Sequence, residues 1–521
     1  MPAQRHLGSL LLGLAVTAAC AGDDLMRAPE SDARPPDPPA SSSAVPIPGC
    51  DDNAPTVPLT PDPNGRELLV RPGGKSCGAA GSEPFATVQD AVSCSAPGDH
   101  IYLLDGTYDE LRISNYRPDL ATPGTVPRHL YISAAAGARI VIDPKRPLSD
   151  WESIVSITDS SYITLANLIV TNSALEQEIA GGVGSVGIAI GGETTPSHHI
   201  SLYNNEVYNV ARHAITLTGG SSYHLERNHI HDVALLNRDR DRPIHDGGIA
   251  TARRHDTTCF KATRNSIHDV FGECLVAQRV SGGLFEGNTV YNCYSVNIYL
   301  DSAENMTVSR NNLYSDDLEA RYFRWDRAAT GIAIARETAG GFPARNHQIT
   351  NNVIFYLGIG IQYGNWEYAG ADNYYAGLRI AHNVIKEMSF ESITATAPWS
   401  SQPGTNRIEN NIVFKPWRPG AAVVSIETGP PDDRGVWTTP SWEISHNLFA
   451  NGVPTGMPGD DGTNRAGDPA FVTSTERFDV GRYKLGPGSA ALHAGRPTPV
   501  DSDFWYRTYH PDTPSIGIHE P

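Results

Sequence analysis

Basic residues are scarce relative to acidic ones in this 521-residue chain, which has 40 Lys and Arg against 58 Asp and Glu and a net charge of −18. This balance disfavours a nucleic-acid partner, because phosphate backbones are bound by clustered Lys and Arg. The chain also lacks CxxC motifs and the Cys/His spacing of zinc sites. Metal ligation by its cysteines is therefore not expected.

An apolar run begins the chain, but it is too short to span a membrane. Residues 1–20, MPAQRHLGSLLLGLAVTAAC, combine one basic residue, Arg5, with this run and with small residues before Cys20. The pattern predicts a secretion signal. The last residues resemble a bacterial lipobox, which predicts lipidation of Cys20 and a cell-surface or outer-membrane lipoprotein. The alternative is plain secretion after cleavage near Ala19.

Residues 21–63 have almost nothing to bury, since Pro, Ser and Asp dominate them. We expect a disordered tether there, because such a stretch cannot offset its ordering entropy. Residues 64–521 would form one folded body. Six cysteines remain after Cys20, an even number that predicts up to three disulfides in an exported chain. Cys77 with Cys94 is the pairing we favour.

A short phrase recurs along the chain: an Asn, any residue, a branched aliphatic residue and usually an aromatic residue or His. The intervals between the five regular phrases are 23 residues, except one of 37, which is one period plus a 14-residue insertion. A fixed period of this length predicts stacked units that bury their apolar faces against neighbours, so the fold is a solenoid. The regular phrases begin at Asn205, Asn228, Asn265, Asn288 and Asn311, and looser ones at Asn167, Asn352, Asn383, Asn411 and Asn447.

Alternation before each Asn predicts strands. Positions three and five before it are mostly apolar, as at Val308 and Met306, whereas positions two and four before it are mostly polar, as at Thr307. This is the period of a half-buried strand. Each Asn has a structural explanation, a left-handed backbone at a tight bend and an amide bonded to the next Asn, so we exclude these residues from the active site.

The two ends of the body carry a family resemblance. The segment SEPFATVQDAVSCSAPGDHIYLLDGTYDE (82–110) resembles the opening, with its capping helix, of bacterial pectin lyase-like proteins, and GDPAFV (467–472) and PSIGIHEP (514–521) resemble their closing segments. The resemblance implies an all-β fold, a right-handed parallel β-helix of about ten coils. It assigns 64–110 to the N-terminal cap and 465–521 to the closing segment.

In this superfamily, substrates usually lie along the sheet that follows the longest turn. We expect Ile188, Ile215, Ile249, Leu275, Ile298 and Ile332 to point inward from that sheet. Their neighbours would then point outward and expose Asn297, Tyr299, Gln278 and Asp301 to solvent. The strands of this sheet are GIAI (187–190), AITL (214–217), GIATAR (248–253), CLVAQR (274–279), NIYLDS (297–302) and GIAIAR (331–336).

Two charged insertions interrupt the repeat at 237–247 and 315–330. Long loops on a regular scaffold are usually functional, so we expect them to wall a cleft. The candidate catalytic residues around it are Arg253, His245, Asp246, Arg279 and Arg336. The candidate substrate-binding residues are Tyr299, Asn297, Gln278, His213 and Trp325. Elsewhere, the pairs His231-Asp232 and His268-Asp269 follow the Asn phrase, where stacked structural pairs are expected.

These residue types suit β-elimination of an acidic polysaccharide. That reaction needs a cation on the uronate carboxylate, a base for the neighbouring C–H and an acid for the leaving oxygen. Arginines would neutralise the carboxylate, His245 or an arginine would move the proton, and Asp301 and Glu273 would ligate Ca²⁺. The alternatives are a glycoside hydrolase using paired carboxylates, an epimerase, and a non-catalytic glycan-binding or adhesive module. The expected partner is an acidic glycan bound by a monomer.

The sequence has no WiDH-type pectate lyase motif, no DPHD-type epimerase motif and no NTD…DD…GHG…RIK set of polygalacturonases. The resemblance therefore predicts a fold and a general substrate class. It does not select one of these families.

Overall fold

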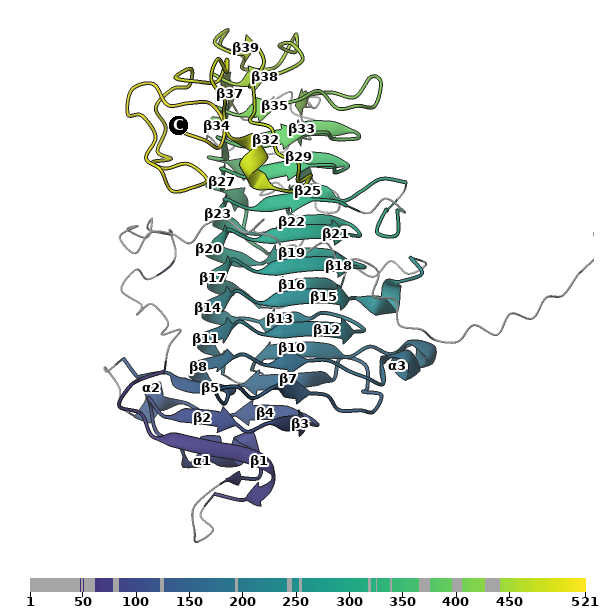
Figure 1. The fold of residues 1–521 in the computed structure, drawn as a ribbon, viewed down its shortest axis with the longest axis vertical. Coiled ribbons are helices and arrows are strands. Elements are labelled where there is room, and N and C mark those ends of the chain that lie inside the picture. The colour runs from purple at the N-terminus through teal and green to yellow at the C-terminus, as the bar shows by residue number, and fades with distance from the viewer. Residues whose placement is uncertain are drawn as a thin grey trace, which may run out of the picture.

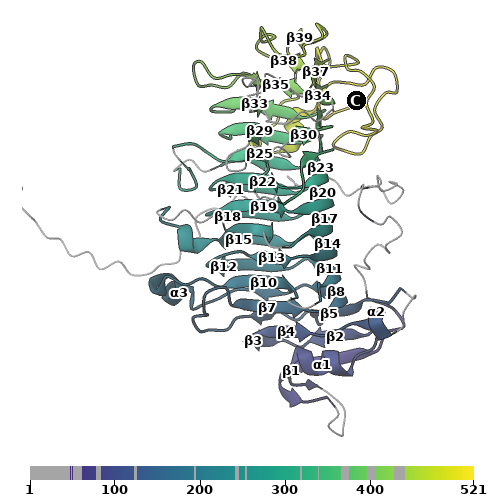
Figure 2. The ribbon, with the colours of Figure 1, turned by 180° about the vertical axis from the view of Figure 1, so that it is seen from behind.

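The computed structural model describes residues 47, 50, 61–77, 84–121, 126–192, 195–240, 246–252, 255–316, 320–324, 326–337, 340–364, 375–395, 405–426 and 441–521. In these residues the chain winds into a stack of coils, each contributing strands to three parallel sheets (Figures 1 and 2). The fold predicted from the repeat and the family resemblance, a right-handed parallel β-helix, is confirmed. No helix in the described part of the chain has the length and apolar character needed to cross a membrane.

Sheet A begins with β1 and runs along the stack to β37. Its strands are β1 (Glu67–Lys75), β2 (His100–Leu103), β5 (Leu130–Ala134), β8 (Ser161–Ala166), β11 (His198–Tyr203), β14 (Gly220–Glu226), β17 (Thr257–Thr263), β20 (Val280–Glu286), β23 (Glu304–Ser309), β27 (Gln348–Thr350), β31 (Arg379–Ala381), β34 (Thr405–Glu409) and β37 (Ser441–Ser445). Beside this path, β26 (Ala344–Arg345) pairs with β23, and β30 (Tyr375–Ala376) pairs with β26.

In each coil, the strand of sheet B follows the bend that ends the strand of sheet A. Its strands are β3 (Gly106–Tyr108), β6 (Ile140–Ile142), β9 (Ile169–Val170), β12 (Glu206–Val210), β15 (His229–Val233), β18 (Ser266–Val270), β21 (Thr289–Cys293), β24 (Asn312–Tyr314), β28 (Val353–Phe355), β32 (Val384–Lys386), β35 (Ile412–Val413), β38 (Leu448–Phe449) and β39 (Arg465–Ala466).

Sheet C carries the strands on which the site was predicted. They are β4 (Leu111–Ser114), β7 (Ser153–Thr158), β10 (Val186–Gly191), β13 (Ile215–Thr218), β16 (Gly247–Thr251), β19 (Glu273–Gln278), β22 (Val296–Asp301), β25 (Thr330–Ala335), β29 (Ile359–Gly364), β33 (Glu391–Ala395) and β36 (Val424–Ile426). The six predicted strands are thus consecutive neighbours here.

The predicted inward row of sheet C is confirmed. Its six residues, from Ile188 to Ile332, pair in register on successive strands and are fully buried. Burying one such side chain contributes about 1.5–3 kcal/mol, and each one packs only against neighbouring coils. The coil interior is therefore a continuous apolar column.

The Asn ladder exists, with one correction. The amide and backbone N–H of each Asn donate to the side-chain oxygen of the next, for example from Asn265 to Asn288 at 3.0 and 2.9 Å. The left-handed residue, however, is the one before the ladder Asn, as at Arg264 with φ 54°. Asn167 is also left-handed, and Leu168 takes the ladder position of its coil, since its N–H donates to the Asn205 oxygen.

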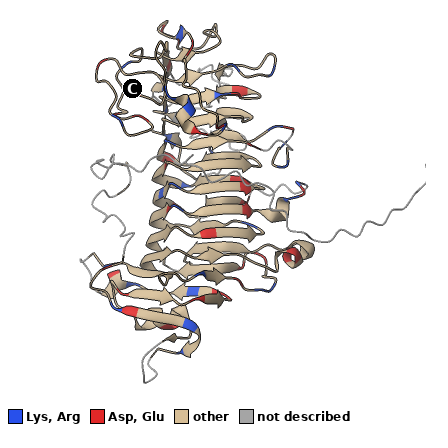
Figure 3. Cartoon of the chain, viewed as in Figure 1, with Lys and Arg blue, Asp and Glu red and all other residues tan. Residues whose placement is uncertain are grey.

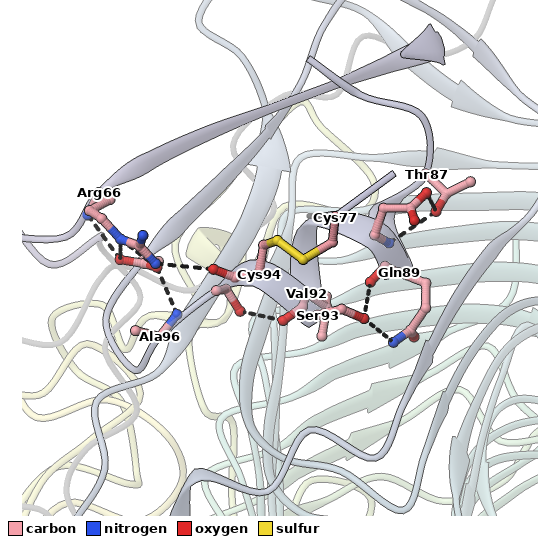
Figure 4. The surroundings of a disulfide bond; sticks show 11 residues. Arg66, Cys77, Thr87, Gln89, Val92, Ser93, Cys94 and Ala96 are labelled. Atoms are coloured by element: carbon pink, nitrogen blue, oxygen red, sulfur yellow. Dashed lines mark hydrogen bonds and ion pairs between the residues drawn. A yellow bond between two sulfur atoms is a disulfide. The ribbon is translucent and has the colours of Figure 1, made fainter. Parts of the chain in front are cut away.

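The helices are short and lie outside the column. They are α1 (Val88–Cys94), α2 (Pro118–Ala121) and α3 (Leu175–Gly181), with 3-10 turns η1 (Leu235–Asn237) and η2 (Val480–Tyr483). Thr87 caps α1 by accepting from the Asp90 N–H at 3.0 Å (Figure 4). Figures 1 and 2 place α1 beside β1 at the N-terminal end of the stack.

Three disulfides are present. Cys77–Cys94 ties the strand region after β1 to the end of α1, as predicted, and the Arg66 guanidinium donates to the Cys94 carbonyl at 3.1 Å (Figure 4). Cys274–Cys293 joins sheet C to sheet B, and Cys50–Cys259 joins residues 209 apart in the sequence. Disulfides persist in oxidising compartments, which fits an extracellular protein.

The C-terminal segment folds back along the upper coils (Figures 1 and 2). His382 is buried at this junction, where its Nδ1 donates to the Gly517 carbonyl at 3.3 Å and its Nε2 accepts from the Asn410 amide at 3.1 Å. Nε2 also lies 3.2 Å from the Thr498 hydroxyl, and protonating it would set an N–H against the Asn410 amide. Burial lowers the pKa of His382 to about 3.

We expect this histidine to make the fold sensitive to acid. The unfolded chain binds the proton below the ordinary pKa of 6.5 and the folded chain does not, so stability is fully present above that pH. It then falls by about 1.4 kcal/mol per pH unit as the pH drops toward the folded pKa. When the free energy of unfolding is measured in urea at several pH values, His382→Gln should reduce its slope against pH by about 1.4 kcal/mol per pH unit. The exposed His510, changed to Gln, should leave it unchanged, and equal slopes for both variants would contradict the assignment.

Candidate functional site on the outer face of sheet C

Tyr299 lies at the centre of the outer face of sheet C. It is 4% exposed and packs with Val276 and Ala333 of the adjacent strands. Its hydroxyl donates to Oε1 of Glu337 at 2.6 Å. Burial raises the pKa of Tyr299 well above its ordinary value, and the charge of Asp301 raises it further. The hydroxyl is therefore a proton donor at neutral pH.

Asp301 lies one row further along the same face and is fully buried. Its carboxylate accepts hydrogen bonds from the Gln278 amide, from the Ser302 hydroxyl at 2.8 Å and from the Glu337 N–H at 2.9 Å. These bonds hold Glu337 beside Tyr299. Because the Asp301 oxygens already accept three donors, a cation bound there would compete with them.

The predicted outward direction of Tyr299, Gln278 and Asp301 agrees with the register, but their predicted exposure to solvent is wrong. Gln278 is 8% exposed. One physical reason is the segment after β25, where the Phe342 N–H donates to the Ser302 carbonyl at 3.1 Å. Alternation sets the direction of a side chain, and what covers it depends on the connecting segments.

Asn297 was predicted to face solvent, and this is also wrong. Its side chain is fully buried, and its amide donates to the carbonyl of Val290 in sheet B at 2.7 Å. Asn297 thus lies at the corner between sheets B and C. Gly248 and Gly331 occupy the same corner on nearby coils, where a Cβ would meet side chains of sheet B.

Two of the predicted arginines lie at the end of this face. The Arg279 N–H donates to the Asp301 carbonyl at 3.0 Å, and its guanidinium pairs with Asp256 at 2.7 Å. The side chains of Arg279 and Asp256 are 17% and 50% exposed. Arg336 is 2% exposed and donates to the Gly341 carbonyl at 2.9 Å, in the segment that follows Glu337.

The opposite edge of sheet C carries a second polar group. Arg212 pairs with Asp246 at 3.0 Å, and the His213 Nε2 lies 3.4 Å from the same carboxylate. The Gly247 N–H donates to Nδ1 of His213 at 2.8 Å, so Nε2 carries the proton. Burial lowers the pKa of His213, which keeps the ring neutral.

Trp151 borders this group and was missed by sequence reasoning. The Arg212 guanidinium lies 4.5 Å from the centre of its ring, and 53% of the residue remains exposed. The available signal in the sequence was only an aromatic residue two positions before β7. Glu337 was missed too, although it directly follows the predicted Arg336.

Three predicted residues, Arg253, His245 and Trp325, lie outside the described residues. Glu273 is partly exposed at the start of β19, and its negative charge contributes to the raised pKa of Tyr299. The structure thus gathers Tyr299, Asp301 and Glu337. Glu273 lies at the other edge of the sheet, where its N–H donates to the Asp246 carbonyl at 3.1 Å, beside the group of Asp246 and His213. The pairing of Asp301 with Glu273 as Ca²⁺ ligands stays a prediction.

The two insertions were predicted to wall the cleft from either side. In their described parts they meet, since the Arg240 guanidinium donates to the Ala320 carbonyl at 2.8 Å. Tyr322 packs on Phe271, with ring centres 4.7 Å apart. The insertions therefore join across the intervening coils along the sheet B to sheet C side.

The fold and this outer face define a β-helix protein with polar groups along one sheet. A family model described as "Right handed beta helix region" matches residues 153–430. The chain belongs to this right-handed β-helix family.

Among solved structures, pectate lyase Pel9A is 14% identical over 89% of this chain and 98% of its own, with a TM-score of 0.49. Lacto-N-biosidase GH136 from Eubacterium ramulus is 12% identical over 74% of this chain and 67% of its own, with a TM-score of 0.41. The A-module of mannuronan C-5 epimerase AlgE6 from Azotobacter vinelandii is 14% identical over 70% and 80%, with a TM-score of 0.40. No curated protein matches the chain by sequence.

Proposed function

We propose that the protein is a carbohydrate-active enzyme that cleaves an acidic polysaccharide by β-elimination on the outer face of sheet C. The observation that carries the proposal is the 2.6 Å hydrogen bond between the Tyr299 hydroxyl and Glu337, fixed by Asp301. A carboxylate and a protonated phenol in contact supply the base and the acid that elimination needs.

The proposed steps use residues of the described face. Arg279 exchanges its partner Asp256 for the uronate carboxylate, because the Asp256 side chain is half exposed and water can solvate it once it is released. Glu337 takes the proton from the adjacent carbon as the carbon–carbon double bond forms. The bond to the leaving sugar oxygen breaks, Tyr299 gives that oxygen its proton, and Glu337 returns a proton to the tyrosinate.

Hydrolysis is the second candidate. It is favoured by the three carboxylates of Glu273, Asp301 and Glu337, whose charges all act on Tyr299. Glycoside hydrolysis uses a pair of carboxyl groups facing one bond. An acidic site also repels uronates unless cations offset the charge. For hydrolysis we therefore expect a neutral glycan as the substrate.

One assay separates the candidates. The purified protein is incubated with acidic and neutral polysaccharides, with and without chelator, while ultraviolet absorbance reports unsaturated ends and a reducing-end assay reports all cleavage. Elimination raises both signals, whereas hydrolysis raises only the second. A changed uronate epimer ratio without cleavage would indicate an epimerase. Glycan binding with neither signal would indicate a non-catalytic module and overturn the proposal.

Arg279→Gln should weaken use of an acidic substrate. Losing one charged hydrogen-bonding partner costs about 1.5–3 kcal/mol, so we expect kcat/KM on a uronate polymer to fall by about 10- to 100-fold. Arg112→Gln is the matched control, since Arg112 lies on β4 of the same sheet and pairs with Glu110. Equal activity of the two variants would remove Arg279 from the site.

We also propose export of a monomer, with Cys20 as the lipid anchor. The three disulfides support export. Lys and Arg are interspersed with Asp and Glu along the stack in the view of Figure 3. The mass of the N-terminal peptide from membrane fractions distinguishes lipidated Cys20 from cleavage near Ala19.

A further inference from the structure

A second group of polar residues lies on sheet B, outside the site just described. Glu206 pairs in register with His229, while His231 pairs with His268 on the next strand. The alternating residues Val207, Ile230 and Ile267 are fully buried in the coil interior. The acidic residue and the three histidines therefore share the outer face of three successive strands.

Carboxylates orient two of these rings. The His231 Nδ1 lies 2.7 Å from Oδ2 of Asp232, and the His268 Nδ1 lies 2.9 Å from Oδ2 of Asp269. Each carboxylate accepts, so each Nδ1 carries a proton and each ring has its Nε2 as the atom available to a metal ion. A carboxylate bonded to the distal nitrogen is the usual support of a metal-binding histidine.

The third ring has its orientation set by the second. The Nε2 atoms of His229 and His268 are 2.9 Å apart. Since the His268 Nε2 accepts, the His229 Nε2 donates, and Nδ1 of His229 is left as the ligand atom. One ligand atom each from Glu206, His229 and His231 lies within 4.8 Å of the others.

A cation belongs between two of these atoms. The His231 Nε2 lies 3.3 Å from Oε1 of Glu206, so the two lone pairs face each other and a proton or a metal ion must lie between them. Two ligand atoms at this separation, each about 2.1 Å from a zinc ion, subtend an angle of about 104° at the metal, close to tetrahedral.

We infer that Glu206, His229 and His231 bind one Zn²⁺ or a chemically similar transition-metal ion. Two imidazoles and one carboxylate suit such a metal, whereas Ca²⁺ requires oxygen ligands. The side chains of Glu206 and Asp232 are 36% and 44% exposed, which gives the ion access, while His231 is 4% exposed. The ion would join β12 to β15. This inference is independent of the function proposed for sheet C.

Calorimetry tests the site on the full exported chain. After chelator treatment and its removal, ZnCl₂ should bind with one ion per chain, and CaCl₂ should not displace it. Glu206→Gln and His229→Gln should each weaken zinc binding at least about tenfold. Zinc should also raise the melting temperature of the wild-type protein, because the ion binds only the folded chain.

Asp232→Asn and His510→Gln complete the experiment. The first keeps all three ligands but removes the support of His231, so zinc binding should weaken by about 10- to 100-fold. The second removes an exposed histidine far along the chain and should bind zinc as the wild type does. Circular dichroism verifies that each variant is folded. Absence of stoichiometric zinc binding by the wild type, or unchanged binding by Glu206→Gln, would overturn the inference.

Discussion

Glu337→Gln should lower kcat by about 10²- to 10⁴-fold on the polysaccharide that the protein cleaves, because the amide cannot take a proton. The substitution keeps the size of the side chain, and its carbonyl oxygen can still accept from the Tyr299 hydroxyl. The backbone N–H of residue 337 still donates to Asp301. Folding should therefore be unchanged, and KM should change far less than kcat.

Tyr299→Phe and Tyr102→Phe are the matched pair for this experiment. Tyr299→Phe removes the proposed acid from the site and should lower kcat by a similar factor. Tyr102 is a partly exposed tyrosine on β2 of sheet A, and its loss should leave kcat unchanged. A Glu337→Gln variant with full activity would exclude the proposed base and leave Glu273 as the carboxylate to test.

Asn265→Ala should destabilise the fold by about 3–4 kcal/mol, because several buried partners lose their hydrogen bonds together. The Asn265 oxygen accepts from the backbone N–H and amide of Asn228 at 2.9 and 3.0 Å. Its own amide donates to the Leu225 carbonyl at 2.9 Å and to the next ladder residue. Alanine supplies none of these hydrogen bonds, and all of them are buried.

Asn464→Ala is the comparison at the end of the ladder. Asn464 accepts from Asn447 and donates to the Ile444 carbonyl and to Asp460, but it is only partly buried. Water can therefore replace part of these bonds, and its loss should cost less than half as much. Chemical denaturation followed by circular dichroism gives both values. Equal destabilisation by the two substitutions would mean that the ladder bonds contribute no more inside the stack than at its end.

The register of this fold could be predicted from the sequence because two signals agree. The repeated Asn marks one bend per coil, and alternation before it separates buried Val308 from polar Thr307. The stacked pair of His231 and His268 was predicted too, and their rings stack 5.4 Å apart at 10°. Short-range periodicity is enough for these assignments, since each coil contacts only its neighbours.

The site could be predicted only in part, because it depends on connections between strands. Tyr299 and Asp301 were found from alternation, yet their burial depends on the segment that carries Glu337 and Phe342. Asn297 was misassigned because the chain bends at the corner before the strand alternation begins. The metal-binding group was not seen because its ligands come from two strands, brought together by the register of Glu206 and His229.

The disulfide between Cys50 and Cys259 has a consequence for how the molecule meets its surroundings. Cys259 lies on β17, the seventh of the thirteen strands along the main path of sheet A. The chain that precedes Cys50 is thus fastened at mid-height on the side of the stack, not at the end formed by α1. A force on the segment before Cys50 would therefore act on the flank of the solenoid, and reduction of this disulfide would release that segment from β17.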